Sequence, residues 1–374
     1  MLTNDKIIRS DEKAIFELRD LYSRYGYNRY KMSRFEEYDL YVRNKDFLVS
    51  DEVITFTDRN GRLLALKPDV TLSIIKNSTD SEKHVEKLYY NENVYRVSQS
   101  THNFKEIMQA GLECIGDLSF YEIAEVVLLA AKSLSLISKN YVLDISHMGL
   151  IAAIMEDMNL SDQGRKEALV YLNQKNPHQL TALLESEGVA DLKKDKLLSL
   201  ATLTGKASDI LSNLGTMMTT EKEKSAFEEL SSLFDILAAN GFGDNVRADF
   251  SVGNNMKYYS GVVLNGYIEG IPESVLSGGQ YDRLLKKMKR QSSAIGFAIY
   301  LDLLERYDEN NKSYDIDTVL LHSDDTDAVT LTELAEKLSA EGGVLVCREV
   351  PKNKTYRRLM KISEGMVTVL EENG

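Results

Sequence analysis

Polar and charged side chains recur on the inward faces of predicted strands, where a charge must be paired or must hold a ligand. Gln109 and Glu113 are four residues apart in the stretch QAGLE, so both point to the same side of their strand. Other strands supply further candidates: Asp69 after LLALKP, Arg96 in NVYRVS, and Tyr258 and Tyr259, which are predicted to begin the strand KYYSGVVLNGYI.

These residue types suit a zwitterionic ligand. Carboxylates accept hydrogen bonds from an ammonium group or an imidazole N–H, and an arginine binds a carboxylate through two parallel hydrogen bonds. The alternative interpretation is a structural ion-pair network across a sheet, and the strand pattern alone leaves both open.

Metal and nucleophilic chemistry find little support in the sequence. The five histidines form no HxH, HExxH or Ser-His-Asp spacing. Cys114 and Cys347 are far apart with no CxxC pattern, which argues against a disulfide framework or a zinc site. SGGQYD lacks the Lys-Ser/Thr of a phosphate-binding loop. We therefore expect no metal and no cofactor.

Charge and hydropathy restrict the partners. The chain has 374 residues and a formal net charge of −13, and surfaces that bind nucleic acid or membranes select lysine and arginine instead. No segment approaches the ~18 apolar residues of a membrane span. We expect a cytoplasmic protein with neither a nucleic-acid nor a membrane partner.

The elements that must position these residues follow from periodicity and turn signals. A helix is predicted over 11–25, a hairpin around Asn60-Gly61, and a helix over 71–77 that Asp69 caps. KLYYNENVYRVS and FKEIMQAGLECIG alternate with period two and predict a long hairpin. A helix over 120–138 and a strand YVLDIS follow.

The rest of the chain changes character twice. Residues 161–240 hold only helical signals, with Pro177, Asp191 and Gly215 as breaks, before strands return. After residue 312 a strand, a helix and a strand predict a small βαβ unit, and MVTVLE a further strand. The predicted fold class is α+β, divided into core residues 1–160, a helical insertion 161–240, core residues 241–312 and a C-terminal segment 313–374.

Taken together, these segments resemble the catalytic core of class II aminoacyl-tRNA synthetases, most closely the histidyl branch. TFTDRNGRLLALKPDVT is similar to the strand pair that ends in an Arg-Pro-Glu-Gly-Thr motif. The long hairpin formed by KLYYNENVYRVS and FKEIMQAGLECIG looks like motif 2. MKYYSG resembles the histidine-recognition motif, SGGQYDRLL the glycine-rich strand and helix, and AIGFAIYLDLL motif 3. The resemblance covers roughly residues 10–310 and implies an antiparallel sheet flanked by helices.

The departures from that pattern bear on activity. In an active synthetase, motif 2 continues Arg-x-Glu into a loop with further arginines that hold ATP, motif 3 ends in an arginine, and the histidine motif brings another arginine. This chain instead continues from Arg96 with Ser98 and Gln99, and has Leu303 and Asn254 at the other two positions. Each well-placed cation stabilises the charge that develops on the α-phosphate. The resemblance therefore implies a retained amino-acid pocket without amino-acid activation.

The family that fits this combination is the regulatory subunit of ATP phosphoribosyltransferase. The resemblance implies a synthetase-type dimer that joins the short catalytic subunit in a hetero-oligomer, activates it, and carries feedback inhibition by L-histidine in histidine biosynthesis. The chain ends soon after a third C-terminal strand, which argues against a full anticodon-binding module. The implied histidine-binding residues are Asp69, Thr71, Arg96, Gln109, Glu113, Tyr258 and Tyr259. Two alternatives stay open: an active histidyl-tRNA synthetase, and a synthetase paralogue that handles or senses another small molecule.

Overall fold

The computed structural model describes residues 10–45, 48, 53–79, 84–98, 101–251, 258–304, 314–363 and 365–373. The chain divides into two compact units, Met1–Glu305 and Arg306–Gly374. Each unit has its own sheet, and each is described by itself.

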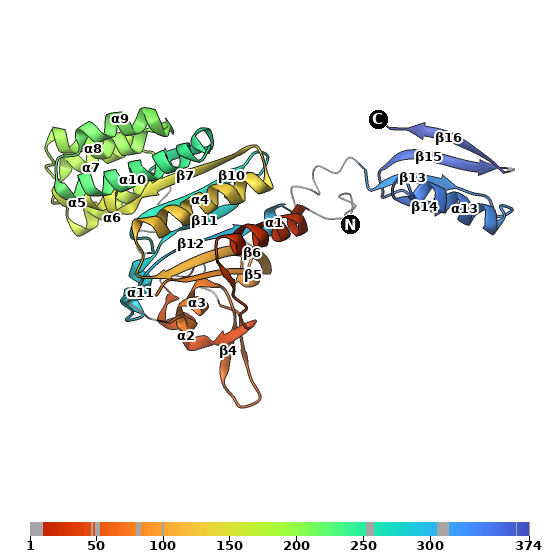
Figure 1. Cartoon of the computed structure of the whole chain (residues 1–374), viewed down its shortest axis with the longest axis horizontal. Coiled ribbons are helices and arrows are strands. Elements are labelled where there is room, and N and C mark those ends of the chain that lie inside the picture. The colour runs from red at the N-terminus through yellow and green to blue at the C-terminus, as the bar shows by residue number, and fades with distance from the viewer. Residues whose placement is uncertain are drawn as a thin grey trace. The chain divides into compact units, whose positions relative to one another are not determined.

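A nine-stranded sheet forms the centre of the first unit (Figure 1), in the order β1-β5-β6-β12-β11-β10-β7-β9-β8. Its strands are β1 (Asn28–Arg29), β5 (Glu86–Val97), β6 (Phe104–Gly116), β12 (Ser293–Tyr300), β11 (Leu276–Gln280), β10 (Val262–Ile268), β7 (Tyr141–His147), β9 (Val246–Asp249) and β8 (Thr204–Lys206). Every neighbouring pair from β5 to β7 is antiparallel. The predicted class II synthetase-like sheet is confirmed.

Two helices cover one face of this sheet, α1 (Ser10–Arg24) and α4 (Phe120–Ile137) (Figure 1). Ser119 begins α4 with a capping box, in which its side chain and that of Glu122 satisfy backbone N–H groups at the helix start. Apolar side chains of α1, α4 and the sheet form one continuous buried cluster. The opposite face of the sheet is left for polar side chains.

A small three-stranded sheet adjoins the long hairpin, with β2 (Phe35–Glu37), β4 (Leu63–Leu66) and β3 (Thr55–Thr57) in the order β2-β4-β3. The predicted turn lies between β3 and β4, where Gly61 has φ +78°, a conformation that favours glycine. The helices α2 (Tyr38–Arg43) and α3 (Thr71–Asn77) flank this sheet. Asp69 accepts the Leu72 N–H at 2.8 Å, as the capping prediction required.

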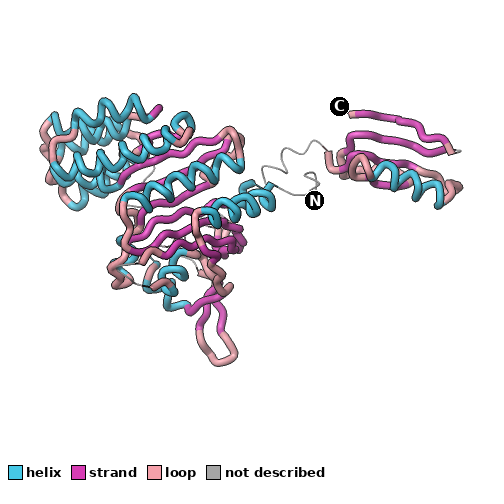
Figure 2. The backbone as a smooth tube through the Cα atoms, in the orientation of Figure 1, coloured by secondary structure: helices cyan, strands magenta, loops and turns pink. Residues whose placement is uncertain are grey.

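The helical insertion contains five helices that follow α5 (Met148–Asp157): α6 (Asp162–Asn173), α7 (Pro177–Ser186), α8 (Asp191–Thr202), α9 (Ala207–Met217) and α10 (Glu221–Ala239). Figure 2 shows them gathered beside the sheet. Their apolar faces join the same buried cluster as α1 and α4.

Two predictions for this region were wrong. Residues 161–240 are not purely helical, because the three-residue strand β8 pairs with β9 at the edge of the sheet. Gly215 is not a break but lies inside α9, where its missing Cβ lets the Phe227 ring approach to 3.0 Å from the ideal Cβ position. The break falls after Met217, and Thr220 caps α10 through a capping box with Glu223.

Short elements complete the first unit. A 3-10 turn, η2 (Gly243–Asn245), precedes β9, and α11 (Asp282–Lys287) follows β11.

Among the described residues, no helix is both long and apolar enough to cross a bilayer.

The second unit is a four-stranded sheet in the order β14-β13-β15-β16 with one helix. The predicted βαβ unit is present as β13 (Ile316–Leu321), α13 (Ala328–Ser339) and β14 (Val344–Cys347), with β13 and β14 parallel. The sequence reading missed β15 (Tyr356–Ser363), which pairs with both β13 and β16 (Met366–Glu372). Arginines and lysines between its apolar residues masked the strand pattern.

Candidate functional site

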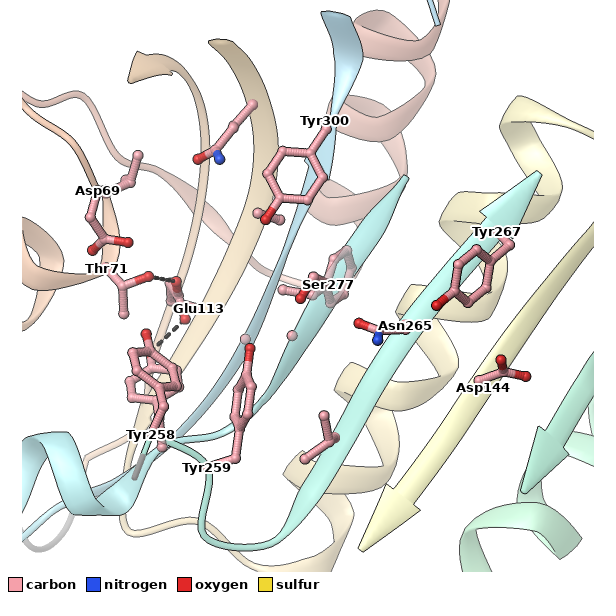
Figure 3. A pocket seen from close by; sticks show the side chains of 18 of the residues that line it. Asp69, Thr71, Glu113, Asp144, Tyr258, Tyr259, Asn265, Tyr267, Ser277 and Tyr300 are labelled. Atoms are coloured by element: carbon pink, nitrogen blue, oxygen red, sulfur yellow. Dashed lines mark hydrogen bonds between the residues drawn. The ribbon is translucent and has the colours of Figure 1, made fainter. Parts of the chain in front are cut away.

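A cavity of about 580 Å³ lies on the polar face of the central sheet. It brings together all seven residues that were predicted to bind histidine, and Figure 3 shows most of them converging from separate elements. These residues are Asp69, Thr71, Arg96, Gln109, Glu113, Tyr258 and Tyr259. Residues that are up to 190 positions apart in the chain therefore face one volume.

Strand alternation on β6 explains why Gln109 and Glu113 reach this cavity. Both are buried, at 3% and 2% exposure, and both line it. The intervening Ala110 and Leu112 belong to the apolar cluster beneath α1 and α4. The period of two thus separates a polar face from an apolar face along one strand.

Two hydroxyl groups hold the Glu113 carboxylate. The Thr71 hydroxyl donates to its Oε1 at 2.8 Å, and the Tyr281 hydroxyl donates to its Oε2 at 2.5 Å (Figure 3). Burial raises the pKa of Glu113 to about 8; the two hydroxyl donors lower it, and the nearby Asp69 carboxylate raises it further. Both donors are neutral hydroxyl groups, and no cation among the described residues is bonded to Glu113.

Asp69 and Arg96 meet at the turn between β4 and α3. Burial raises the pKa of Asp69, and the Leu72 N–H and the Arg96 guanidinium oppose that rise. Arg96 donates its Nε hydrogen to the Pro68 carbonyl at 3.1 Å. This bond uses one of the five guanidinium N–H groups, and no other acceptor among the described residues bonds the guanidinium, so its remaining N–H groups can bind a ligand carboxylate.

A buried ion pair holds that turn in place. The Lys67 side chain is 1% exposed and its Nζ lies 2.5 Å from Glu92 Oε2 on β5. The Tyr95 N–H donates to the Lys67 carbonyl at 2.8 Å. Asp69 is therefore presented by a turn that is fixed to the strand carrying Arg96.

The interpretation as a structural ion-pair network can now be weighed against the geometry. Within the described part of the chain, no ion pair joins Arg96 to Asp69 or Glu113, and the carboxylates accept hydrogen bonds from hydroxyl and backbone groups. The buried Glu113, the half-buried Asp69 and the Arg96 guanidinium all line the open volume of the cavity. This arrangement favours a ligand-binding site.

Tyr258 and Tyr259 do line the cavity, but the prediction that they begin a strand was wrong. Both precede β10, which starts at Val262. The Ser260 N–H donates to the Gln280 carbonyl at 2.8 Å, so regular pairing begins only after the tyrosines. Their rings pack edge to face with centroids 4.8 Å apart, which turns both rings toward the cavity.

Sequence reasoning missed other tyrosines of the site. Tyr281 comes directly after β11, and its ring lies 5.8 Å from that of Tyr258. In the stretch SGGQYD, a tyrosine at the end of a strand is a signal that could have identified Tyr281. Tyr90 on β5 and Tyr300 on β12 also line the cavity.

Gly296 on β12 provides the space that Glu113 occupies. A Cβ at this position would lie 1.8 Å from Glu113 Oε2 and 2.5 Å from the Leu112 carbonyl oxygen. The glycine therefore admits the carboxylate onto the surface of the sheet.

The cavity also continues past these residues, over β10, β7 and β9. Asp144, Lys175, Asp249, Asn265 and Tyr267 line this second part, and none was predicted. Lys175 comes from the helical insertion, and its Nζ lies 2.7 Å from Asp249 Oδ2. Burial and the Asp249 charge raise the pKa of Asp144 to about 6, while Arg247 and Lys175 lower it.

The positions where cations were expected to be lost are partly visible. Leu303 is partly buried and packs against the large apolar cluster. Ser98 lies at the end of the β5–β6 hairpin, where its N–H donates to the Asn103 carbonyl at 2.9 Å. Gln99 and Asn254 lie outside the described residues. Over the described residues, no group of three or more His, Cys, Asp or Glu side chains is placed to hold a metal ion.

Comparison with known proteins gives a consistent family match. A family model described as histidyl-tRNA synthetase matches residues 6–304. A protein of Oceanobacillus iheyensis named ATP phosphoribosyltransferase regulatory subunit is 28% identical over 294 residues, covering 78% of this chain and 72% of the relative.

Solved structures show the same fold. A structure from Bacillus halodurans C, described as an ATP phosphoribosyltransferase regulatory subunit/histidyl-tRNA synthetase, has a TM-score of 0.70 at 25% identity and covers 90% of this chain and 88% of that one. A chain of the ATP phosphoribosyl transferase (HisG:HisZ) complex from Thermotoga maritima has a TM-score of 0.62 at 18% identity, with 78% and 97% covered. The second likeness bears on the fold alone.

Proposed function

Because the chain belongs to the histidyl-tRNA synthetase family, we propose that it is a member that has kept the histidine pocket and lost amino-acid activation. In this proposal it is the non-catalytic regulatory subunit of ATP phosphoribosyltransferase, acting in the cytoplasm in the first step of histidine biosynthesis. The relatives that carry that name support the assignment.

The observation that carries the proposal is the charge pattern of the cavity. The buried Glu113, the half-buried Asp69 and the Arg96 guanidinium line one end of the cavity, whereas the motif 3 position holds the apolar Leu303. Among the described residues that line the cavity, the cations are Arg96 and Lys175, and Lys175 is already paired with Asp249. Such a lining suits a zwitterion far better than a triphosphate, which needs several cations.

The residues fit histidine as follows. The imidazole N–H would donate to Glu113, which Thr71 and Tyr281 hold in position. The α-ammonium group would bind Asp69 and the Gln109 amide oxygen, and the α-carboxylate would bind the free N–H groups of Arg96. Tyr258 and Tyr259 would close the ring against solvent.

Regulation then follows from linkage. Histidine shifts the equilibrium between two states of a hetero-oligomer only by the difference between its affinities for those states. We propose that the chain dimerises as synthetases do, activates the short catalytic subunit, and lowers that activity when histidine occupies the pocket.

Active histidyl-tRNA synthetase is the second candidate, because the matching family model bears that description. It requires ATP to bind beside the amino acid. The two candidates therefore differ in one measurable property.

The test is calorimetric titration of the purified chain with L-histidine and, separately, with Mg-ATP. We expect histidine to bind and ATP not to bind, and we expect no histidine-dependent pyrophosphate exchange. Addition of the chain to a short catalytic subunit should raise phosphoribosyltransferase activity, and histidine should reverse the increase. ATP binding together with exchange would favour the synthetase.

A further inference from the structure

The cavity is longer than one amino acid. Ala298, Ser277, Asn265 and Asp144 are successive cross-strand neighbours on β12, β11, β10 and β7, and all four line it. Glu113 lies on β6, beyond β12. Because adjacent strands are ~4.8 Å apart, Asp144 is four strands, or roughly 19 Å of backbone, away from Glu113. A free amino acid at Glu113 leaves the Asp144 end of the cavity open.

The two aspartates at that end, Asp249 and Asp144, differ in how many hydrogen-bond and ion-pair partners they have. Asp249 is fully engaged, since Lys175 Nζ lies 2.7 Å from its Oδ2 and the Ser251 hydroxyl donates to its Oδ1 at 2.6 Å. Asp144 differs, because its Oδ1 is buried and has no hydrogen-bond partner among the described residues. A buried acceptor without a donor costs free energy that a ligand can recover by supplying one.

The charge at this end selects the kind of donor. Asp144 and Asp249 carry two negative charges against the single ammonium of Lys175, and Arg247 on β9 is exposed and does not line the cavity. Asn265 and Tyr267 add neutral polar groups beside Asp144 (Figure 3). A carboxylate in this setting prefers a charged N–H donor to a neutral one.

We propose that the Asp144 end of the cavity is a second subsite, which binds a primary ammonium group of a small aliphatic amine beside the amino acid. We call it the amine subsite, and it consists of Asp144, Lys175, Asp249, Asn265 and Tyr267. The inference rests on the proposed function only in placing histidine at the Glu113 end. The Lys175–Asp249 ion pair links the amine subsite to the helical insertion.

The test uses the full chain saturated with L-histidine and titrated with 1,4-diaminobutane, with uncharged 1,4-butanediol as the matched ligand. We expect the diamine to bind and the diol not to bind. Asp144→Asn should weaken diamine binding roughly tenfold or more, because it removes the charge from the acceptor. Asp195→Asn, on the exposed side of α8, is the control and should leave diamine binding unchanged.

A second variant predicts the opposite direction. Lys175→Gln removes the ammonium that neutralises Asp249, so it should tighten diamine binding several-fold. Lys175 is 42% exposed, so the substitution should not disturb folding. This variant keeps the proposal testable if Asp144→Asn fails to fold.

Several outcomes would overturn the amine subsite: no diamine binding, competition between diamine and histidine, or diamine affinity that neither Asp144→Asn nor Lys175→Gln alters. If histidine itself fails to bind, the proposed function fails, and the same diamine titration of the unliganded chain still tests the subsite. The two failures are therefore distinguishable.

Discussion

At the scale of single residues, Glu113 concentrates the chemistry of the site. It is 2% exposed, two hydroxyl groups hold its oxygens, and none of the cations in the described part of the chain is bonded to it. A buried carboxylate in this state is poised to gain an N–H donor from a ligand. Burial also raises the pKa of this carboxyl group, and the nearby Asp69 charge adds to the rise.

Glu113→Gln should weaken L-histidine binding by roughly tenfold to a hundredfold, since a hydrogen bond to a charged group contributes about 1.5–3 kcal/mol. The fold should persist, because the glutamine oxygen can accept from one of the two hydroxyl groups while its NH₂ group donates to the oxygen of the other. Calorimetric titration measures the affinity, and circular dichroism checks the fold. Glu106→Gln, an exposed change on the same strand, is the control. Equal affinity in folded Glu113→Gln and parent would remove Glu113 from the site.

Glu113 should also leave a signature in the pH dependence of stability. Its pKa of about 8 exceeds the ordinary value of 4.5, so between these values the folded chain binds more protons at this group than the unfolded chain. The free energy of unfolding therefore falls as pH rises through this window, by at most about 1.4 kcal/mol per unit of pKa difference. Glu113→Gln lacks this contribution.

Urea unfolding at pH 5 and pH 8 measures the effect. The free energy of unfolding of Glu113→Gln should rise relative to the parent as the pH increases, whereas that of Glu106→Gln should not. Identical pH dependence in Glu113→Gln and the parent would show that the carboxyl titrates normally.

At the scale of elements, β12 and the turn that follows it both shape the cavity and pack into the apolar core. Its Gly296 admits the Glu113 carboxylate, and its Ala298 and Tyr300 continue the floor of the cavity. The short helical turn after β12 carries Leu303, which packs into the apolar cluster. One segment thus supplies space for the ligand on one face and core packing on the other.

Gly296→Ala should abolish histidine binding and lower the free energy of unfolding by about 1–3 kcal/mol, the usual cost of overpacking. The added methyl group would overlap Glu113 Oε2 and the Leu112 carbonyl oxygen. Gly343→Ala is a matched control, because the nearest atom to its new Cβ is 3.9 Å away. Urea unfolding and histidine titration of both variants provide the comparison, and normal binding by Gly296→Ala would contradict the packing argument.

Leu303→Arg should not create ATP binding. A single guanidinium at the end of β12 leaves Ser98, Gln99 and Asn254 unchanged, and these positions also lack a cation. Mg-ATP titration of the variant should give no heat of binding. A clear gain in ATP affinity would show that the missing arginine at position 303 alone accounts for the absence of ATP binding, and would contradict the prediction.

The local sequence pattern predicted some residues of this site, whereas others are brought to it only by contacts between segments far apart in the chain. Period-two alternation placed Gln109 and Glu113 together, and a strand end placed Asp69. Asp144 and Lys175 could not be found in this way, because they reach the cavity through pairing of β7 with β10 and packing of the helical insertion, across separations of more than 70 residues. The strand β8 escaped prediction because three residues carry too short a pattern, and the ladder with β9 is what makes it a strand.

At the scale of the whole molecule, every residue that lines the cavity belongs to the unit Met1–Glu305. That unit has its own nine-stranded sheet and its own large apolar cluster. The four-stranded unit has a separate, small cluster built around Leu320, Leu338 and Ile362. Histidine binding should therefore not depend on the second unit.

A chain that ends at Glu305 should keep its histidine affinity within about twofold, because the removed unit contributes no residue to the lining of the cavity. Calorimetric titration of this shortened chain against the parent tests the expectation. Loss of binding in a shortened chain that is still folded would show that the second unit takes part in the site.

The ring of aromatic side chains around the cavity has an optical consequence. The chain has 20 tyrosines and no tryptophan, and Tyr90, Tyr258, Tyr259, Tyr267, Tyr281 and Tyr300 all line this one volume. Because no tryptophan accepts their excitation energy, the tyrosines account for the intrinsic fluorescence of the chain. Occupancy of the cavity should thus be readable as a change in intrinsic tyrosine fluorescence, with no label attached.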